Sequence, residues 1–301
     1  MPSYAVLGKQ RIIYTMNRLL LHIASLLTLI FLVSCSGKED AKSAEDVQQG
    51  QTAPVGQKNY VQKVLGLQFT SAYCQACPGL ASSLKEAEEL MPGVLVPISF
   101  HLDYNDMSDP MAVSASSTLM RKYGFNVLPY FVINFRDGEI GVGTDVDSVL
   151  EAVRYELEQW PVECGVAVKS EYDAQNGKVT VTVRVASNVE GRYRCNAFLV
   201  EDGIDYLQVG AADGEAYLHD NVVRKMMSVS IEGSNLGSGL ALEAGTEYPL
   251  TFSSQLDPSW NPDAMRVVAV AMATEDQGRT YYCANVNSCA LQDGESDYLT
   301  E

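Results

Sequence analysis

Short apolar runs alternate with amphipathic stretches between residues 59 and 160. Runs rich in Val, Leu, Ile and Phe are typical of buried strands, whereas apolar residues spaced three or four apart are typical of one face of a helix. The predicted strands cover residues 61–70, 94–100, 130–135 and 139–142, and the predicted helices begin at Pro78, near Pro110 and after Asp145, which can cap the last of them. Strands separated by helices predict an α/β domain in which helices cover a sheet.

The pattern changes over residues 161–292. Here short β-branched or apolar runs are separated by Gly, Asn and Asp, and in one run four valines alternate with polar residues, which is the period of a half-buried strand. The predicted strands cover residues 166–168, 179–185, 197–200, 226–231, 248–252 and 267–272. Several short strands without helices predict an antiparallel β-sandwich. The expected fold class is therefore α/β followed by all-β, in two domains.

Residues 1–34 have the pattern of a lipoprotein signal peptide. Three basic residues precede an apolar run over residues 19–33, which is shorter than the roughly 20 residues that a membrane-spanning helix needs. The run ends in Leu-Val-Ser-Cys at residues 32–35 and resembles the bacterial lipobox. This resemblance implies that Cys35 carries a lipid and becomes the first residue of the mature protein. A buried Cys35 in an uncleaved anchor is the alternative.

Residues 35–58 are dominated by Gly, Ser, Gln and Asp and show no apolar period, so they are predicted to be a flexible tether. The Lys-Glu-Asp at residues 38–40 resembles the surface-export signal of Bacteroidota lipoproteins, although it also suits the start of a solvated linker. The protein is expected at the outer membrane, on its periplasmic or its surface-exposed side. The acidic residues 293–301 are predicted to be a solvated tail.

The balance of charge argues against a nucleic-acid partner. The 301 residues include 21 Lys and Arg against 38 Asp and Glu, which gives a formal net charge of -17. A chain of this charge repels phosphate backbones. The predicted partners are the membrane, through the lipid anchor, and exported proteins or a ligand at the cell surface.

The sequence Cys74-Gln75-Ala76-Cys77 stands where the first predicted strand ends and the first helix begins. The free N–H groups and the dipole of a helix N-terminus favour a thiolate at Cys74. Two intervening residues let Cys77 reach Cys74 and release an attacking thiolate by forming a disulfide. These two are therefore the candidate catalytic residues. A permanent disulfide and half of a zinc site are the alternatives, but zinc needs four ligands, so we predict no metal site and no cofactor.

Residues 122–133, Lys-Tyr-Gly-Phe-Asn-Val-Leu-Pro-Tyr-Phe-Val-Ile, resemble the thioredoxin segment that leads to the cis-proline of that family. The resemblance implies a thioredoxin-like domain over residues 59–160, in which Leu128 and Pro129 face the two cysteines and hold the substrate backbone. Residues 138–141 would close the site. Tyr73 is the third candidate for substrate binding and replaces the usual Trp. Gln68 stands where thioredoxins keep a buried acid, and Gln cannot accept a proton from the second thiol.

Four further cysteines lie in the region of predicted β-structure: Cys164, Cys195, Cys283 and Cys289. Because exported proteins meet an oxidising environment, we expect two structural disulfides that link strands of the sandwich. Four cysteines allow three pairings, and the sequence does not choose among them. With Cys74, Cys77 and Cys35 the total is seven, an odd number that leaves Cys35 for its separate role.

Gln208 is followed by the run His219-Asp220-Asn221-Val222-Val223-Arg224. Together with the lipobox and the thioredoxin-like half, this pattern resembles the Omp family of Bacteroidota outer-membrane lipoproteins, named for its twenty-eight-kilodalton members. The resemblance implies an outer-membrane lipoprotein with adhesin or receptor roles. His219 and Asp220 could hold a metal, or Arg224 a carboxylate, or all of them could form a polar network that fixes a connection between strands.

Two functions from different classes remain open. The first is a thiol–disulfide oxidoreductase in which Cys74 and Cys77 act on exported proteins. The second is a non-catalytic surface adhesin or receptor that uses the thioredoxin-like half as a scaffold. The pair of cysteines beside a proline motif favours the first, and Tyr73 and Gln68 favour the second.

Overall fold

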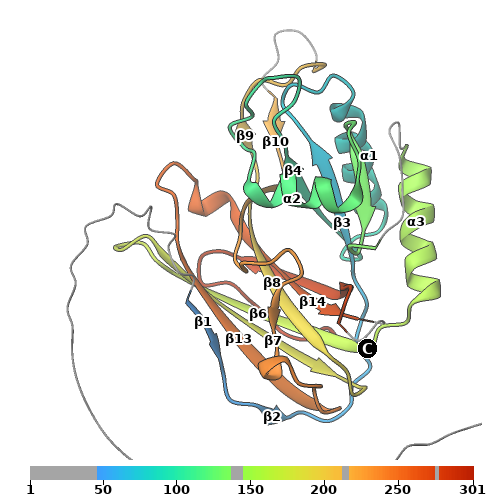
Figure 1. Ribbon diagram of the computed structural model, residues 1–301, viewed down its shortest axis with the longest axis vertical. Coiled ribbons are helices and arrows are strands. Elements are labelled where there is room, and N and C mark those ends of the chain that lie inside the picture. The colour runs from blue at the N-terminus through green and yellow to red at the C-terminus, as the bar shows by residue number, and fades with distance from the viewer. Residues whose placement is uncertain (1–45, 137–144, 212–216, 275–277) are drawn as a thin grey trace, which may run out of the picture. The chain divides into compact units, whose positions relative to one another are not determined.

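A computed structural model describes residues 46–136, 145–211, 217–274 and 278–301 (Figure 1). The predicted signal peptide, Cys35, the first part of the tether, the strand expected at residues 139–142 and the site-closing residues 138–141 lie outside the described residues. No helix in the described ranges is long and apolar enough to cross a membrane.

The described chain is mostly β with few helices. This agrees with the predicted β-structure of residues 161–292. Its helices are α1 (Cys77–Leu90), α2 (Ser114–Tyr123) and α3 (Val146–Gln159), with short 3-10 turns η1 (Gly237–Gly239) and η2 (Pro262–Ala264). The Asp145 side chain caps α3 by accepting a hydrogen bond from the backbone N–H of Ser148 at 2.9 Å, which confirms the cap read from the sequence.

The larger sheet is mixed and runs in the order β15-β14-β8-β11-β4-β3-β5, with β12 beside β8. The bounds are β3 (Val64–Thr70), β4 (Leu95–His101), β5 (Tyr130–Ile133), β8 (Tyr193–Glu201), β11 (Val222–Met226), β12 (Ser234–Asn235), β14 (Met265–Ala273) and β15 (Tyr282–Ala290). Strand β4 is parallel to β3 and to β11, and the other pairs are antiparallel. Strands from both predicted domains therefore belong to one sheet.

Strand β11 joins the larger sheet beside β4, and the connection that precedes it lies near the ends of β3 and β4. Val222, the first residue of β11, is paired with Ser99 near the end of β4, and the Ser99 N–H donates to the Asn221 carbonyl at 2.7 Å. The chain between β8 and β11 reaches the carboxyl ends of β3 and β4, where the Val209 N–H donates to the Ala72 carbonyl and the ring of His219 lies against that of His101. It includes the two-stranded pair β9 (Ile204–Asp205) and β10 (Leu218–His219).

The smaller sheet is antiparallel in the order β1-β13-β7-β6-β16, with β2 also beside β13. Its strands are β1 (Asp46–Gln49), β2 (Ala53–Pro54), β6 (Cys164–Asp173), β7 (Lys178–Ser187), β13 (Thr246–Gln255) and β16 (Glu295–Ser296). The four alternating valines of β7, Val179, Val181, Val183 and Val185, are fully buried and share a core with residues of β8 and β14. The alternation seen in the sequence thus predicts the buried face of β7 correctly.

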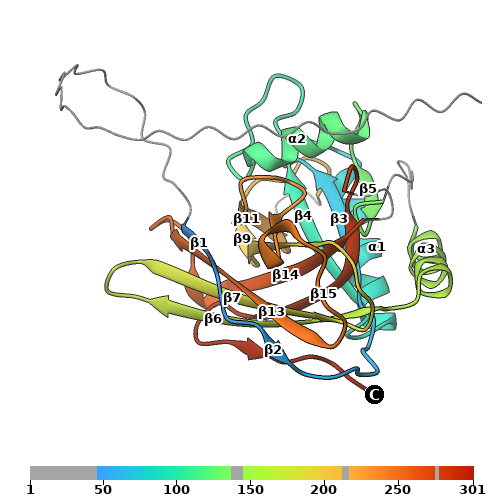
Figure 2. The ribbon, with the colours of Figure 1, turned by 60° about the horizontal axis from the view of Figure 1, so that its bottom comes forward.

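Two further cores lie around β3, β4 and β5. Leu80, Leu84 and Ala87 of α1 pack with Val149 and Val153 of α3 in one cluster. On the other side of the strands, α2 packs into a cluster that also contains residues of β8, β14 and β15. Figures 1 and 2 show α1 and α3 next to each other, and Figure 2 shows α2 apart from them.

Both ends of the described chain are more ordered than their composition indicates. Residues 46–54, expected to belong to the tether, supply β1 and β2 along β13, and Val47 packs against the core of the smaller sheet (Figure 2). Near the other end, β16 pairs with β6, and the Tyr298 hydroxyl donates to Glu247 at 2.7 Å. Both polar segments are thus paired with strands of the smaller sheet.

Two further differences concern strands. The strand expected at residues 226–231 is displaced to Val222–Met226, because Val222 and Val223 are the buried members of that segment. Strand β15 is absent from the prediction. Its sequence includes Asn285 and Asn287, which do not have the apolar alternation of a strand. Both are buried, and their side-chain amides donate to the Cys164 and Val166 carbonyls of β6.

Candidate active site

Cys74 and Cys77 form a disulfide at the N-terminal end of α1, with their Cα atoms 5.4 Å apart. The chain leaves β3 at Thr70 and turns so that the Cys74 N–H donates to the Ser71 carbonyl at 3.1 Å. Helix α1 then begins at Cys77 without a side-chain cap, and Pro78 in its first turn has no N–H to satisfy. Both cysteines are only 1% exposed. The site is therefore a buried disulfide directly after a central strand.

Leu128 and Pro129 lie beside this turn. Phe69 of β3 is paired with Tyr130, the first residue of β5, so Leu128 and Pro129 precede β5 at the end of the sheet where β3 leads into the cysteine turn. The Leu128–Pro129 peptide bond is cis. Leu128 belongs to the same cluster of buried side chains as both cysteines. The structure thus brings the candidate substrate-binding residues to the same end of the sheet as the cysteines.

Gln68 is buried at 3% exposure on β3. Its Oε1 accepts a hydrogen bond from the Ser99 hydroxyl at 3.0 Å, whereas its Nε2 has no hydrogen-bond partner among the described residues. A neutral amide therefore occupies this buried position. It can donate a hydrogen bond, but it cannot take a proton from a thiol.

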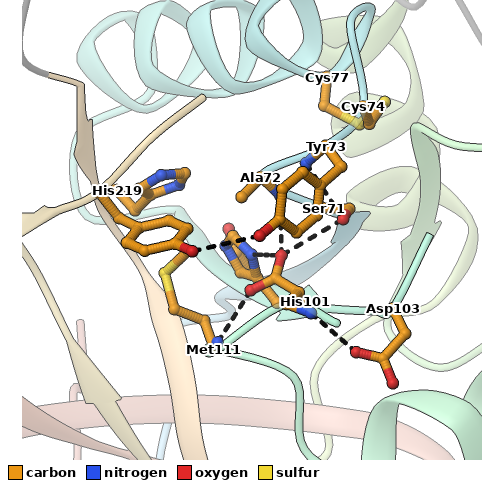
Figure 3. A network of polar contacts seen from close by, with 12 residues as sticks. Ser71, Ala72, Tyr73, Cys74, Cys77, His101, Asp103, Met111 and His219 are labelled. Carbon is orange, nitrogen blue, oxygen red and sulfur yellow. Dashed lines mark hydrogen bonds and ion pairs between the residues drawn. A yellow bond between two sulfur atoms is a disulfide. The ribbon is translucent and has the colours of Figure 1, made fainter. Parts of the chain in front are cut away.

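A buried carboxylate does lie next to the cysteine turn, and no motif in the sequence marks it. Asp109 accepts hydrogen bonds from the N–H of Ala72 at 2.7 Å, the hydroxyl of Ser71 at 3.3 Å and the N–H of Met111 at 2.8 Å (Figure 3). Its other partner is Nδ1 of His101, at 2.9 Å. Burial acts to raise the pKa of Asp109, but His101 and the N–H donors outweigh it and lower the pKa. An ionised Asp109 thus orients the residues that precede Tyr73 and Cys74.

His219 packs its ring against that of His101, with ring centroids 5.2 Å apart, and against Tyr217 at 4.7 Å. Its Nε2 lies 3.4 Å from the Leu207 carbonyl. Burial, helped by the nearby His101, lowers the pKa of His219 to about 4. The Asp220 side chain accepts a hydrogen bond from the Gly203 N–H at 2.9 Å. No group of three potential metal ligands occurs among the described residues. His219 is thus part of a polar network.

The low pKa of His219 predicts a loss of stability in mild acid. The unfolded histidine takes up a proton near pH 6.5, whereas the folded one resists protonation until about pH 4. Stability is therefore lost as the pH falls between these values, by roughly 2 kcal/mol at pH 4.5. Urea unfolding from pH 7.5 to 4.5 should show this slope and a flatter one for His219→Gln. Equal slopes for the two proteins would contradict the assignment.

Arg224 has an internal partner. Its Nε lies 3.1 Å from Oε2 of Glu201 on the neighbouring strand β8, and its guanidinium lies over the ring of Trp260 at 5.2 Å. A carboxylate for Arg224, one of the possibilities left open by the sequence, is therefore supplied by the protein itself, in agreement with the polar network that was the other possibility.

The connection between β9 and β10 crosses the cysteine turn. We define residues 206–211 of it as the strap. The Val209 N–H donates to the Ala72 carbonyl at 2.8 Å, and the Gln208 Nε2 donates to the Cys74 carbonyl at 3.0 Å. The role of Gln208, singled out in the sequence, is thus to bind the backbone of the cysteine turn.

The four remaining described cysteines require a correction. Cys164, Cys195, Cys283 and Cys289 are free thiols, so the structure lacks the two disulfides predicted for them. Cys283 and Cys289 lie on the same strand, β15, about 20 Å apart along it, which is beyond disulfide range. Burial raises the pKa of all four thiols. They are therefore protonated and pack as small apolar side chains.

Comparison with solved structures shows the same fold in two other proteins. HBP35 of Porphyromonas gingivalis superposes with a TM-score of 0.65 at 17% identity, covering 78% of this chain and 76% of that one. Protein AGR_C_4864 from Agrobacterium tumefaciens gives a TM-score of 0.51 at 16% identity, covering 79% of this chain and 98% of that one. At these identities the likeness concerns the fold alone.

No curated protein matches the chain in sequence. Residues 116–294, more than half of the chain, match the family model described as outer membrane protein Omp28. This segment includes Leu128 and Pro129, the strap and all of β6 to β15, but not the two cysteines of the disulfide. The chain therefore belongs to the Omp28 family of outer membrane proteins.

Proposed function

We propose that this protein is a lipid-anchored outer-membrane protein whose Cys74–Cys77 pair exchanges disulfides with exported proteins. The observation that carries the proposal is the position of the disulfide. It follows a central strand, stands at the N-terminal end of α1 and lies beside Leu128 and Pro129. A helix N-terminus stabilises the thiolate that exchange requires.

The order of elements around the disulfide supports a thioredoxin-like half. The chain runs β3-α1-β4-α2-β5-α3, with β4 parallel and β5 antiparallel to β3. This is the arrangement implied by the resemblance of residues 122–133 to thioredoxins. Leu128 has no backbone hydrogen bond among the described residues, so its N–H and carbonyl can pair with an extended client segment, as a further strand would.

The exchange itself needs only thiols and disulfides. A client thiolate attacks the sulfur of Cys74, the Cys74–Cys77 bond breaks, and Cys77 leaves as a thiolate that takes up a proton. A second client thiolate then attacks the mixed disulfide and releases Cys74. Two electrons pass from the client to the cysteine pair, and a client disulfide is formed. The reverse sequence reduces a client disulfide. Because Gln68 cannot accept a proton, proton transfer at Cys77 is slow in that direction.

In this proposal Cys35 anchors the protein to the membrane, because its thiol would carry the lipid as a thioether. Membership of a family of outer membrane proteins supports this location. Residues 46–54 run along β13 before the chain reaches β3. The length of chain between the membrane and the folded part is therefore shorter than a tether that extends to residue 58.

A second function, a surface adhesin or receptor with a fixed disulfide, is favoured by one observation. Cys74 and Cys77 are each 1% exposed, and a disulfide that thiols cannot reach acts as a permanent cross-link. In that case the disulfide stabilises the fold, and the β-rich part binds the ligand.

Trapping of mixed disulfides distinguishes the two functions. In Cys77→Ala, the client bound to Cys74 cannot be released by Cys77, so covalent complexes should accumulate in cells. They should appear on non-reducing gels, disappear on reduction and be absent from the double variant Cys74→Ala/Cys77→Ala. If Cys77→Ala forms no complexes and the Cys74–Cys77 pair of the wild type has a reduction potential below about -300 mV, the exchange function is wrong and the disulfide is a structural cross-link of an adhesin or receptor.

A further inference from the structure

The Cys74–Cys77 disulfide is covered by other parts of the protein, so a thiol in solution cannot contact its sulfur atoms directly. A thiolate must approach a disulfide sulfur nearly in line with the S–S bond, because that bond is the one it breaks. With Cys74 and Cys77 each 1% exposed, an external thiol has no such approach in the structure described. Some neighbouring segment must therefore move before the disulfide can react.

The strap is bound directly to the cysteine turn. Besides its bond to Cys74, the Gln208 Nε2 lies 3.4 Å from the Ser71 carbonyl. Together with Val209, the strap thus binds the carbonyls of residues 71, 72 and 74. Next along the strap, Gly210 lies so close to Gln75 that a Cβ on Gly210 would be 2.3 Å from the Gln75 carbonyl oxygen. Only glycine fits at this approach.

The way the strap is attached suits movement. Its contacts with the turn are neutral hydrogen bonds, including the 3.2 Å contact between the hydroxyls of Tyr206 and Tyr73. Leu207 is 58% exposed and Val209 is 38% exposed, so the apolar packing of the strap lies mainly at its first residue, Tyr206, which contacts the cluster of Ala72, Met111 and Val222. Segments with few buried apolar contacts open locally without unfolding the rest of the protein.

We propose that the strap is a gate on the disulfide: it holds the Cys74–Cys77 pair closed to thiols, and exchange requires Gln208 and Val209 to leave the carbonyls of the cysteine turn. This inference rests on the proposed exchange function for its biological use. It also identifies what a client must supply. An extended peptide has backbone N–H groups that can replace the donors of the strap, whereas a small thiol has none.

The test measures how fast dithiothreitol, a dithiol reductant, opens the disulfide in the full chain. One thiolate of the reagent breaks the Cys74–Cys77 bond, and its second thiolate displaces the cysteine still bound. Two protein thiols and a cyclic disulfide result. Samples are quenched in acid, unfolded and alkylated, and the gain of two labelled cysteines is followed by mass spectrometry.

Gly210→Ala should open the gate. The added Cβ collides with the Gln75 carbonyl, and the φ angle of +88° at Gly210 strains any residue with a side chain. Gly203→Ala is the matched control, because Gly203 also has a positive φ, +71°, but a Cβ there meets no atom within 4 Å. We expect reduction of Gly210→Ala to be about tenfold faster or more than that of the wild type and of Gly203→Ala. Equal rates in all three proteins would overturn the gate.

Gln208→Ala provides a second test that introduces no clash. It removes the side-chain donor and should also speed reduction, by a smaller factor than Gly210→Ala. To exclude reduction through global unfolding, the rates are compared with the free energy of unfolding of each variant. A rate that rises only in proportion to the unfolded fraction contradicts a local gate.

The outcome is independent of the proposed exchange with clients. If the rates change as expected but Cys77→Ala traps no client, the gate exists and the exchange function fails. If clients are trapped but the rates do not change, the exchange function holds and the gate is rejected.

Discussion

Asn134→Ala is expected to lower the free energy of unfolding by about 4 kcal/mol, since it leaves the buried Leu65 N–H without its acceptor, removes one hydrogen bond to the buried Glu156 carboxylate and strains the backbone. Asn134 is 1% exposed and follows the last residue of β5. Its Oδ1 accepts from the Leu65 N–H at 2.8 Å, and its Nδ2 donates to Oε1 of Glu156 at 2.9 Å. Asn134 thus joins β3 to α3.

The backbone of Asn134 adds a third connection. Its carbonyl accepts a hydrogen bond from the Cys283 N–H of β15 at 2.8 Å. The φ angle of Asn134 is 48°, in the left-handed region that Asn tolerates better than other residues with side chains. Alanine in its place would strain this conformation as well as remove the side-chain bonds. The loss should therefore loosen β15 against β5, and hydrogen exchange at Cys283 should accelerate.

Asn105→Ala is the matched control for this prediction. Asn105 has a similar φ angle of 52°, but it is exposed and its side chain has no hydrogen bond among the described residues. Its substitution should cost about 1 kcal/mol, the contribution of the backbone alone. Urea unfolding at pH 7.5 measures both variants. A similar small loss in the two would show that the network around Asn134 does not stabilise the fold.

Asp109→Ala is expected to cost about 3–5 kcal/mol at neutral pH, because it leaves several buried hydrogen-bond donors without an acceptor. The variant leaves the His101 ring and the N–H groups of Ala72 and Met111 without their acceptor. Because Ala72 and Ser71 precede the cysteines, the turn should also become more mobile. Hydrogen exchange at Ala72 should increase by more than the change in stability requires.

The pH dependence of the Asp109 effect has a defined sign. The pKa of Asp109 is lowered in the folded protein, so its contribution to stability is complete above the unfolded value near 4. The contribution is lost as the pH falls below that value and through the folded pKa. The difference between wild type and Asp109→Ala should therefore be constant from pH 8 to 5 and shrink in stronger acid. A difference that grows in acid would contradict the assignment.

Asp173→Ala is the control for Asp109. Asp173 also accepts several hydrogen bonds, from the N–H groups of Gln175 and Asn176 and from the Asn176 amide, but it is exposed. Water can replace these donors, so the loss should stay at about 1 kcal/mol or below. A loss as large as that of Asp109→Ala would show that burial is not the source of the effect.

The amino-acid sequence by itself determined the local features. The alternation of valines predicts the buried face of β7, Asp145 predicts the start of α3, and the two cysteines are correctly placed at the junction of β3 and α1. These features depend on side-chain period, capping and backbone preferences over a few residues. Such preferences act within one element, so they can be read without knowing what lies next to it.

Only the tertiary structure decided what surrounds the disulfide. Asp109 comes from the loop after β4, and the strap from a connection more than 130 residues further along the chain than Cys74. Asp109 reaches the cysteine turn because β4 lies beside β3, and the strap is near it because β11 joins the sheet beside β4. The register of strands distant in sequence is chosen by the burial of whole faces against a shared core, and no local pattern records which distant strand will be the neighbour.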